Sequence, residues 1–299
     1  MDLVVIGSVA LDSVKTPFGK SDYSLGGAAS YACVAASMFS RPGMVGIVGS
    51  DFPKEHIDFF KTKGIDLEGL VNADGKTFHW GGYYEYDMNQ AHTTNTELNV
   101  FADFKPHLTK NYKKTKFLFL ANILPSLQLN ALKQMDGSPF VAMDTMNLWI
   151  ENNKEEVLEN MKHIDLVLIN DAEARQLCET PNLILAAKSI LKLGPKAVII
   201  KKGEHGAMLF TDGVYFSAPA YPLETVRDPT GAGDSFAGGI MGYLAKTKDT
   251  SIENIKRAII YGSAIASFNA EGFGLQNLKK ITIDDIEKRY KEFENLVDF

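Results

Sequence analysis

The sequence contains few cysteines and no long apolar segment. Cys33 and Cys178 are the two cysteines among 299 residues, and both lie in apolar helical patterns, which is typical of buried free thiols in a reducing compartment. No stretch approaches the roughly 20 consecutive apolar residues of a membrane-spanning helix. Residues 1–11 are apolar, but Asp2 stands where a signal peptide carries positive charge. We therefore expect a cytoplasmic protein without membrane contact.

Long basic runs and common nucleotide-binding motifs are also missing. The net charge is −6, which argues against a nucleic-acid partner. The six histidines show no spacing typical of metal ligands. The chain has neither a Walker A pattern, G-x-x-x-x-G-K-[ST], nor G-x-G-x-x-G after its first apolar run. These absences count against P-loop NTPases and dinucleotide dehydrogenases.

Short apolar runs typical of buried strands alternate with helical patterns along most of the chain. The expected strands are residues 3–6, continued by 9–12, then 45–48, 117–120, 140–143, 166–169, 197–200 and a return strand at 207–210. The expected helices are residues 28–36, 54–63, 127–135, 154–163, 172–178, 183–193, 255–268 and 283–296, with one more after Asp234. This alternation predicts an α/β fold with a mainly parallel sheet covered by helices on both faces.

Residues 76–104 do not follow this alternation. Trp80, Tyr83 and Tyr84 are interleaved with glycine and polar residues, which predicts hairpins of a small side sheet. Such a sheet can cover a binding cleft, although an ordinary surface hairpin fits the pattern equally well. We expect a single domain spanning residues 1–299, with segments near 13–24 and 76–104 inserted in it as a lid.

The segment from Asp228 to Ala245 reads D-P-T-G-A-G-D-S-F-A-G-G-I-M-G-Y-L-A. A turn with Gly231 and Gly233 leads into an apolar helix, whose free N–H groups and dipole favour an anion. Asp234 lies in the first turn of this helix, and we expect the positive field there to lower the pKa of its carboxyl group. The pattern indicates a base next to a phosphate.

Three glycines inside this helix are unusual, because each costs about 1 kcal/mol relative to alanine. They are Gly238, Gly239 and Gly242. We expect another backbone or a ligand to approach the helix closely at these positions.

Polar residues recur where the expected strands end, and the ends of parallel strands face the same way. They are Asp12, Asn122, Asp144, Asn170 and the Lys202–Gly203 loop. Each alone is explained equally well as a helix cap or a turn former. Asn170 and Glu173, one helical turn apart, could orient a hydrated Mg²⁺ or simply form a capping box.

Together these residues resemble the PfkB, or ribokinase-like, family of carbohydrate and nucleoside kinases. The stretch that begins at Asp228 is similar to its C-terminal signature, and Gly26–Gly27 with the helix after them to its N-terminal signature. Asn170 and Glu173 match its N-x-x-E motif. The resemblance spans essentially the whole chain. It implies a ribokinase-like three-layer α/β/α fold with a mainly parallel central sheet and a small β-sheet lid.

The resemblance implies that ATP, bound with Mg²⁺, phosphorylates a primary hydroxyl group. It makes Asp234 the general base and gives Gly231, Ala232 and Gly233 the N–H groups of an anion hole. The residues expected at ATP are Asn170, Glu173, Lys202, Gly203, Gly206, Thr230, Gly231 and Gly233, with Mg²⁺ held through water by Asn170 and Glu173. Those expected at the acceptor are Asp12, Gly26, Gly27, Tyr31, Asn122 and Asp234. Asp228 and the loop 269–274 are expected to hold a monovalent cation, K⁺ in some members.

The acceptor itself stays open between two classes. Tyr31 and Ala10 stand where family members often carry asparagines that touch the sugar. A small sugar is the first expectation, and a nucleoside whose base stacks on the aromatic lid is the alternative. A non-catalytic sugar- or nucleotide-binding protein on this fold is a second alternative, and a hydroxymethylpyrimidine-type kinase is disfavoured by the expected lid. Family members also form dimers through the lid, so a homodimer is a further expectation.

Overall fold

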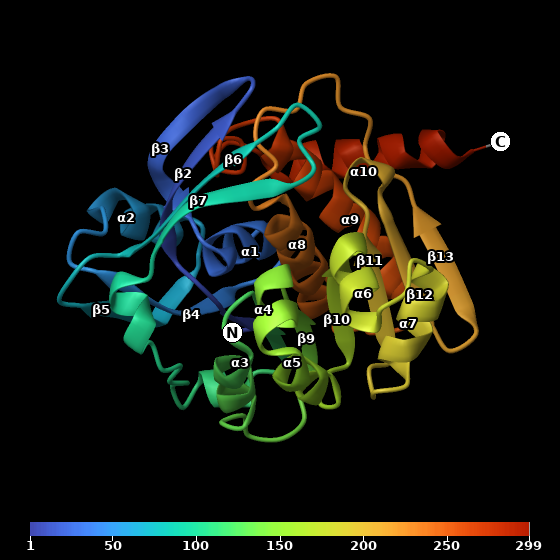
Figure 1. Cartoon of the computed structure of the whole chain (residues 1–299), viewed down its shortest axis with the longest axis horizontal. Coiled ribbons are helices and arrows are strands. Elements are labelled where there is room, and N and C mark those ends of the chain that lie inside the picture. The colour runs from blue at the N-terminus through green and yellow to red at the C-terminus, as the bar shows by residue number, and fades with distance from the viewer. Residues whose placement is uncertain (299) are drawn as a thin grey trace.

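A nine-stranded sheet runs through the centre of the protein in the computed structural model, which describes residues 1–298 (Figure 1). In spatial order its strands are β13 (Val214–Ala218), β12 (Ala207–Thr211), β11 (Ala197–Lys201), β10 (Leu166–Asn170), β9 (Phe140–Asp144), β8 (Phe117–Leu120), β1 (Leu3–Ile6), β4 (Pro42–Gly49) and β5 (Asp66–Ala73). β12 pairs antiparallel with both β11 and β13, whereas all other neighbours pair in parallel. The carboxyl ends of the parallel strands therefore share one edge.

Helices cover both faces of this sheet. One face packs against α1 (Ala28–Ala36), α2 (Lys54–Thr62), α8 (Ala232–Thr247), α9 (Ile252–Ala270) and α10 (Ile283–Val297). The other packs against α3 (Pro125–Leu132), α4 (Asn147–Asn152), α5 (Lys154–Met161), α6 (Asp171–Cys178) and α7 (Leu183–Leu191). Leu3 and Val5 belong to the first core and Val4 and Ile6 to the second. Because successive strand residues are buried on opposite faces, β1 is continuously apolar. Helices on both faces of the sheet confirm the predicted three-layer architecture.

A second, four-stranded sheet lies over one edge of the molecule (Figure 1). Its order is β3 (Gly19–Gly26), β2 (Ala10–Thr16), β6 (Phe78–Tyr84) and β7 (Ala91–Glu97), and we call it the lid sheet. The expectation that residues 9–12 continue the first strand is wrong, because Ala10 already begins β2 of the lid sheet. Asp12 therefore reaches the site from the lid sheet.

Elements with polar or short sequences escaped prediction. β5 and β13 are edge strands with several exposed residues, so they lack the continuous apolar run of the inner strands. α4 has only six residues. Residues 1–298 also contain three short 3₁₀ turns, η1 (Asn99–Asp103), η2 (Tyr112–Lys114) and η3 (Gly203–His205). Within residues 1–298, no helix has the length and apolar character needed to cross a membrane.

α8 passes between α1 and α9, and its glycines make this possible. A Cβ on Gly238 would lie 2.2 Å from the carbonyl oxygen of Ala32, and one on Gly242 would lie 2.6 Å from the Cα of Ala36. On the opposite side, a Cβ on Gly239 would lie 3.1 Å from the Cα of Gly262. The close approach predicted for these glycines is therefore made by two neighbouring helix backbones.

Candidate active site

The turn that begins α8 leaves two backbone donors free. Gly231 has a φ of +75°, and a Cβ there would lie 2.4 Å from the ring of Tyr31, so only glycine fits. Ala232 N–H donates to the carbonyl of Pro229 at 3.0 Å. Within residues 1–298, the N–H groups of Gly231 and Gly233 have no acceptor. These two donors, at the positive end of a helix, are suited to an anion.

Asp234 lies in the first turn of α8, beside these donors. Its pKa is raised to about 7, chiefly by burial and then by repulsion from Asp144, whereas Lys201 and its own N–H group lower it. The expectation that the helix terminus lowers this pKa is therefore wrong. Loss of hydration and a second carboxylate outweigh the helix dipole.

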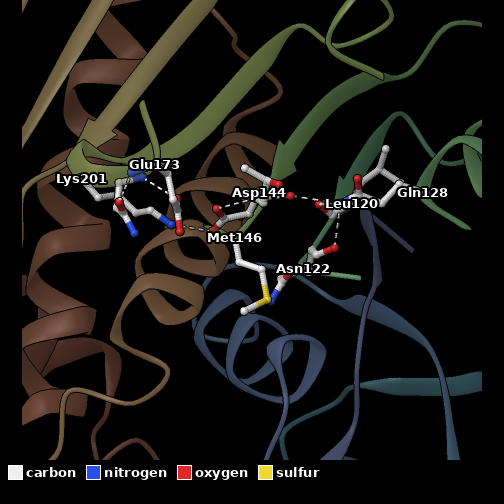
Figure 2. A network of polar contacts seen from close by, with 10 residues as sticks. Leu120, Asn122, Gln128, Asp144, Met146, Glu173 and Lys201 are labelled. Atoms are coloured by element: carbon white, nitrogen blue, oxygen red, sulfur yellow. Dashed lines mark hydrogen bonds and ion pairs between the residues drawn. The ribbon is translucent and has the colours of Figure 1, made fainter. Parts of the chain in front are cut away.

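Lys201 and Asp144 form a buried ion pair next to α8. Lys201 ends β11 and Asp144 ends β9, and their Nζ and Oδ2 atoms are 2.6 Å apart. Figure 2 shows the Lys201 side chain reaching towards Asp144 alongside Glu173. A Cβ on Gly233 would lie 3.4 Å from Lys201 Nζ, which brings the ammonium group to the first turn of the helix.

Asn170 and Glu173 form the capping box that was one of the two predicted roles. Asn170 Oδ1 accepts from Glu173 N–H at 2.8 Å, and Glu173 Oε2 accepts from Asn170 N–H at 2.8 Å. Glu173 has a pKa raised to about 7 by burial and by repulsion from Asp144 and Asp234, against the attraction of Lys201. Its Oε1 has no hydrogen-bond donor within residues 1–298. A buried carboxylate with a free oxygen fits a water-bound Mg²⁺ as well as a cap.

Asp12 is held at the other end of the site by the glycine pair. Its Oδ2 accepts from Gly27 N–H at 3.3 Å, and a Cβ on Gly26 would lie only 1.8 Å from that oxygen. Gly27 has a φ of +89°, and a Cβ there would lie 2.5 Å from the carbonyl oxygen of Ser8. Burial, with repulsion from Asp228 and Asp234, raises the pKa of Asp12 to about 7 against the effect of the Gly27 N–H.

Tyr31 and Asp228 lie between Asp12 and the turn of α8. Tyr31 is buried, and its hydroxyl has no hydrogen-bond partner within residues 1–298. Asp228 accepts from the N–H groups of Thr230 and Gly274, both at 2.9 Å, and so joins the turn before α8 to the loop after α9. Its role with a monovalent cation stays a prediction.

Two further groups of predicted site residues have structural contacts of their own. Asn122 Oδ1 accepts from Trp149 Nε1 at 2.8 Å, and its Nδ2 donates to Met146 Sδ at 3.1 Å, as Figure 2 shows for Met146. Lys202 N–H donates to the carbonyl of Gly206 at 2.8 Å across the turn that contains η3. A Cβ on Gly206 would lie 2.0 Å from the carbonyl oxygen of Ala218, so glycine is needed there for close packing.

Sequence reasoning missed Lys201 and left Asp144 without a role. The expected strand ends at residue 200, one residue short of Lys201. In the structure β11 includes Lys201, and the parallel register of β9, β10 and β11 brings its side chain to Asp144. A lysine at the carboxyl end of a strand that flanks Asn170 was the available signal.

The lid sheet closes over this group of residues. The Thr230 hydroxyl donates to the Tyr84 hydroxyl at 3.3 Å, which links β6 to the turn before α8. Trp80 pairs with Asp12 in the parallel register of β2 and β6. Paired residues of parallel strands point to the same face, so Trp80 lies on the side of the lid sheet that faces the site.

Comparisons with known proteins agree with this arrangement. Residues 2–282 match the pfkB family carbohydrate kinase domain. The chain belongs to the pfkB family. It is 30% identical over 251 residues to cytidine kinase of Thermococcus kodakarensis, an alignment that covers 81% of this chain and 88% of that protein. It is an ATP-dependent kinase with an alcohol group of a sugar or a nucleoside as acceptor, which confirms the predicted family and reaction class.

Two solved structures show the same fold. Burkholderia thailandensis nucleoside kinase in complex with inosine has a TM-score of 0.81 at 19% identity, covering 97% of each chain. A putative ribokinase II from E. coli in complex with ATP and Mg²⁺ has a TM-score of 0.80 at 18% identity, covering 97% of this chain and 99% of that chain. The predicted ribokinase-like fold is confirmed.

Tyr84→Phe tests the link between the lid sheet and the α8 turn of this pfkB kinase. The variant loses the bond to Thr230, and one hydrogen bond contributes about 1 kcal/mol, so we expect kcat/KM for the acceptor to fall about fivefold. ATP hydrolysis without acceptor is expected to rise, because a looser lid admits water. Tyr83→Phe is the control, since Tyr83 is exposed and stacks on His92 at 4.9 Å. Equal kinetics for the two variants would show that the Tyr84 bond has no role in closure.

Proposed function

We propose that the protein transfers the γ-phosphoryl group of ATP to the 5′-hydroxyl of a nucleoside. This acceptor was the alternative to a small sugar in the sequence-based prediction. The observation that carries the proposal is Trp80, which lies beside Asp12 on the inner face of the lid sheet.

The indole of Trp80 lies along the lid sheet rather than away from it. A Cβ on Gly82 would lie 2.4 Å from the indole ring, so the absence of a side chain at Gly82 makes room for this orientation. Trp80 Nε1 donates to the Thr93 hydroxyl at 3.2 Å, which fixes the ring. The side chain is only partly buried. A flat, partly uncovered aromatic surface next to a sugar-binding carboxylate suits a base attached to a ribose.

The comparisons support the same acceptor class. The Thermococcus relative is a cytidine kinase, and a nucleoside kinase of Methanocaldococcus jannaschii is 24% identical over 273 residues, covering 88% of this chain and 84% of that protein. Tyr31, which replaces the frequent sugar-binding asparagine of the family, is fully enclosed against Gly231. Its bulk reduces the polar contacts available to a free pentose.

Each residue group has a defined task in this proposal. Asp12 binds hydroxyl groups of the ribose and holds the 5′-hydroxyl towards Asp234. Asp234, once deprotonated, takes the proton of that hydroxyl as it attacks phosphorus. The free N–H groups of Gly231 and Gly233 donate to the transferring phosphoryl group. This arrangement acts by positioning and by charge stabilisation.

Magnesium and ATP fit the residues at the opposite end. The free oxygen of Glu173 and the amide of Asn170 are suited to orient water on Mg²⁺, which when bound neutralises phosphate charge. The proposed ATP site is bordered by the turn that contains Lys202, Gly203 and Gly206, and by Thr230. Homodimer formation through the lid sheet and K⁺ binding at Asp228 stay predictions.

Trp80→Ala tests the acceptor class. Stacking on an aromatic side chain contributes about 1–3 kcal/mol per base, so KM for a nucleoside is expected to rise about 5- to 150-fold. A free pentose has no base, and its KM should change far less. Trp80→Phe keeps an aromatic surface and is expected to retain most of the nucleoside affinity. Equal losses for nucleoside and pentose in Trp80→Ala would contradict a base-stacking role.

A further inference from the structure

We propose that Lys201 binds the γ-phosphoryl group of ATP and neutralises the charge that it gains during transfer, with Asp144 holding the ammonium group in place until the nucleotide binds. The inference rests on the phosphoryl transfer of the proposed function. It assigns a role at the same site to a residue that lies outside the family motifs found in the sequence.

Lys201 lies close to the anion-binding turn of α8. Lys201 Nζ lies beside Gly233, where a Cβ would be 3.4 Å from the ammonium group. Gly233 also carries one of the two free N–H groups of the α8 turn. Because Gly233 has no side chain, no Cβ at this position stands against the ammonium group. A charged donor and a free backbone donor therefore lie close together at the start of α8.

Lys201 is surrounded by negatively charged side chains. Asp144, Glu173 and Asp234 all act electrostatically on Lys201. Burial lowers the pKa of Lys201, but attraction to these carboxylates outweighs burial and holds the pKa above its usual value, so the side chain stays charged. One ammonium group among three carboxylates leaves the cluster acidic. A phosphate group entering this space meets repulsion unless a cation is available, and Lys201 is the cationic side chain that acts on Asp234 and Glu173 alike.

The ion pair of Lys201 and Asp144 contributes little to the stability of the fold. The Lys201 side chain is 17% exposed and that of Asp144 is 4% exposed. Withdrawing two such charges from water costs about as much as their attraction returns. Asp144 is further fixed by an N–H bond from Thr145 at 2.9 Å, and its own carbonyl accepts from Gln128 Nε2 at 3.0 Å. A rigid carboxylate that positions a flexible lysine suits phosphate binding, in which lysine acts as a mobile point charge.

The test compares Lys201→Met with the double variant Lys201→Met/Asp144→Asn. Loss of one charge-stabilising donor typically lowers kcat about 10²- to 10³-fold, and we expect this for both variants. The double variant matters because Lys201→Met alone leaves Asp144 buried without a partner. If Lys201 only neutralises Asp144, the double variant recovers wild-type kcat, and that result overturns the proposal.

A binding measurement separates this inference from the choice of acceptor. Calorimetric titration of the acceptor-free protein with Mg–ATP and Mg–ADP needs no nucleoside. We expect both variants to bind ATP at least about tenfold more weakly, with ADP affinity changed by less than about threefold. Equal losses for ATP and ADP, or no loss, contradict contact with the γ-phosphoryl group. A failure to phosphorylate nucleosides would leave this result intact.

Lys196→Met is the matched control. Lys196 directly precedes β11 and pairs with Asp165 Oδ1 at 2.7 Å, at the end of the strand opposite Lys201. Its side chain is 79% exposed. The same loss of a lysine–aspartate pair there is expected to leave kcat and the ATP affinity unchanged. A loss equal to that of Lys201→Met would assign the effect to the sheet as a whole and overturn the proposal.

Discussion

Replacing Asp234 with asparagine is expected to lower kcat by about 10²- to 10⁴-fold, the usual contribution of a positioned general base. Asparagine keeps the size of the side chain but cannot accept the proton of the acceptor hydroxyl. The affinity for Mg–ATP should be unchanged or slightly higher, because a negative charge beside the phosphate site is removed. Rapid-quench turnover and calorimetric titration measure the two quantities separately.

Asp285→Asn is the control for this variant. Asp285 occupies the third position of α10, as Asp234 does in α8, and forms a capping box with Thr282. The same change of carboxylate to amide at the same helical position is therefore made away from the site. We expect a small loss of stability from the weakened cap and no change in kcat. Turnover by Asp234→Asn within a factor of about ten of wild type would contradict the base assignment.

The pH profile gives a second readout of the same residue. Because the pKa of Asp234 is raised from its usual 3.8 to about 7, the carboxylate form predominates only above that pH. The value of kcat/KM is therefore expected to rise with pH up to about 7 and then level off. A carboxyl group whose pKa is higher in the folded state than in the unfolded state destabilises the fold once the pH exceeds its pKa in the unfolded state. Asp234→Asn should accordingly lose the acid limb of the profile and show a higher Tm at pH 8.

Replacing Gly238 with alanine is expected to produce the largest loss of stability among the helical glycines of α8. The new Cβ would lie 2.2 Å from the carbonyl oxygen and 2.5 Å from the Cα of Ala32, and both are backbone atoms of α1. The better helix propensity of alanine adds about 1 kcal/mol, whereas overpacking of this kind costs about 1–3 kcal/mol and more where backbone must move. We expect a net loss of about 2 kcal/mol in the free energy of unfolding.

The same substitution is expected to affect catalysis, because α8 carries Asp234 and Gly233. Separation of α8 from α1 moves the anion-binding turn relative to Asp12, so kcat should fall together with Tm. Gly239→Ala is the comparison, since its Cβ would meet Gly262 Cα and an Ile265 methyl group at 3.1 Å, a milder contact with a movable side chain. Urea titration of both variants measures the difference. Equal stability of Gly238→Ala and wild type would contradict the close backbone packing.

The strand and helix order could be predicted because the inner strands are continuously apolar and the helices strongly periodic. β8 and α1 begin and end where their patterns predicted. The small sheet was also recognisable from the interleaved aromatic and polar residues before β7. Edge strands such as β5 were missed because half-exposed strands carry no continuous apolar run.

The sequence predicted those parts of the site whose residues lie close together in the chain. Gly231, Gly233 and Asp234 lie in one turn, and Asn170 and Glu173 lie one helical turn apart. The pKa of Asp234 was predicted in the wrong direction, because burial and then repulsion from Asp144, which lies on a separate strand, raise it. Such effects depend on sheet register, which short motifs do not encode. The pairing of Asp12 with Trp80 in the lid sheet was hidden for the same reason.

The most direct test is identification of the product made by the wild-type protein from Mg–ATP and an equimolar mixture of cytidine, inosine and ribose. The account predicts a nucleoside 5′-monophosphate, formed in a one-to-one ratio with ADP and ahead of ribose 5-phosphate. Mass spectrometry with quantified ADP distinguishes these products in a single experiment. Ribose 5-phosphate as the main product, or ADP released without any phosphorylated nucleoside, would contradict it.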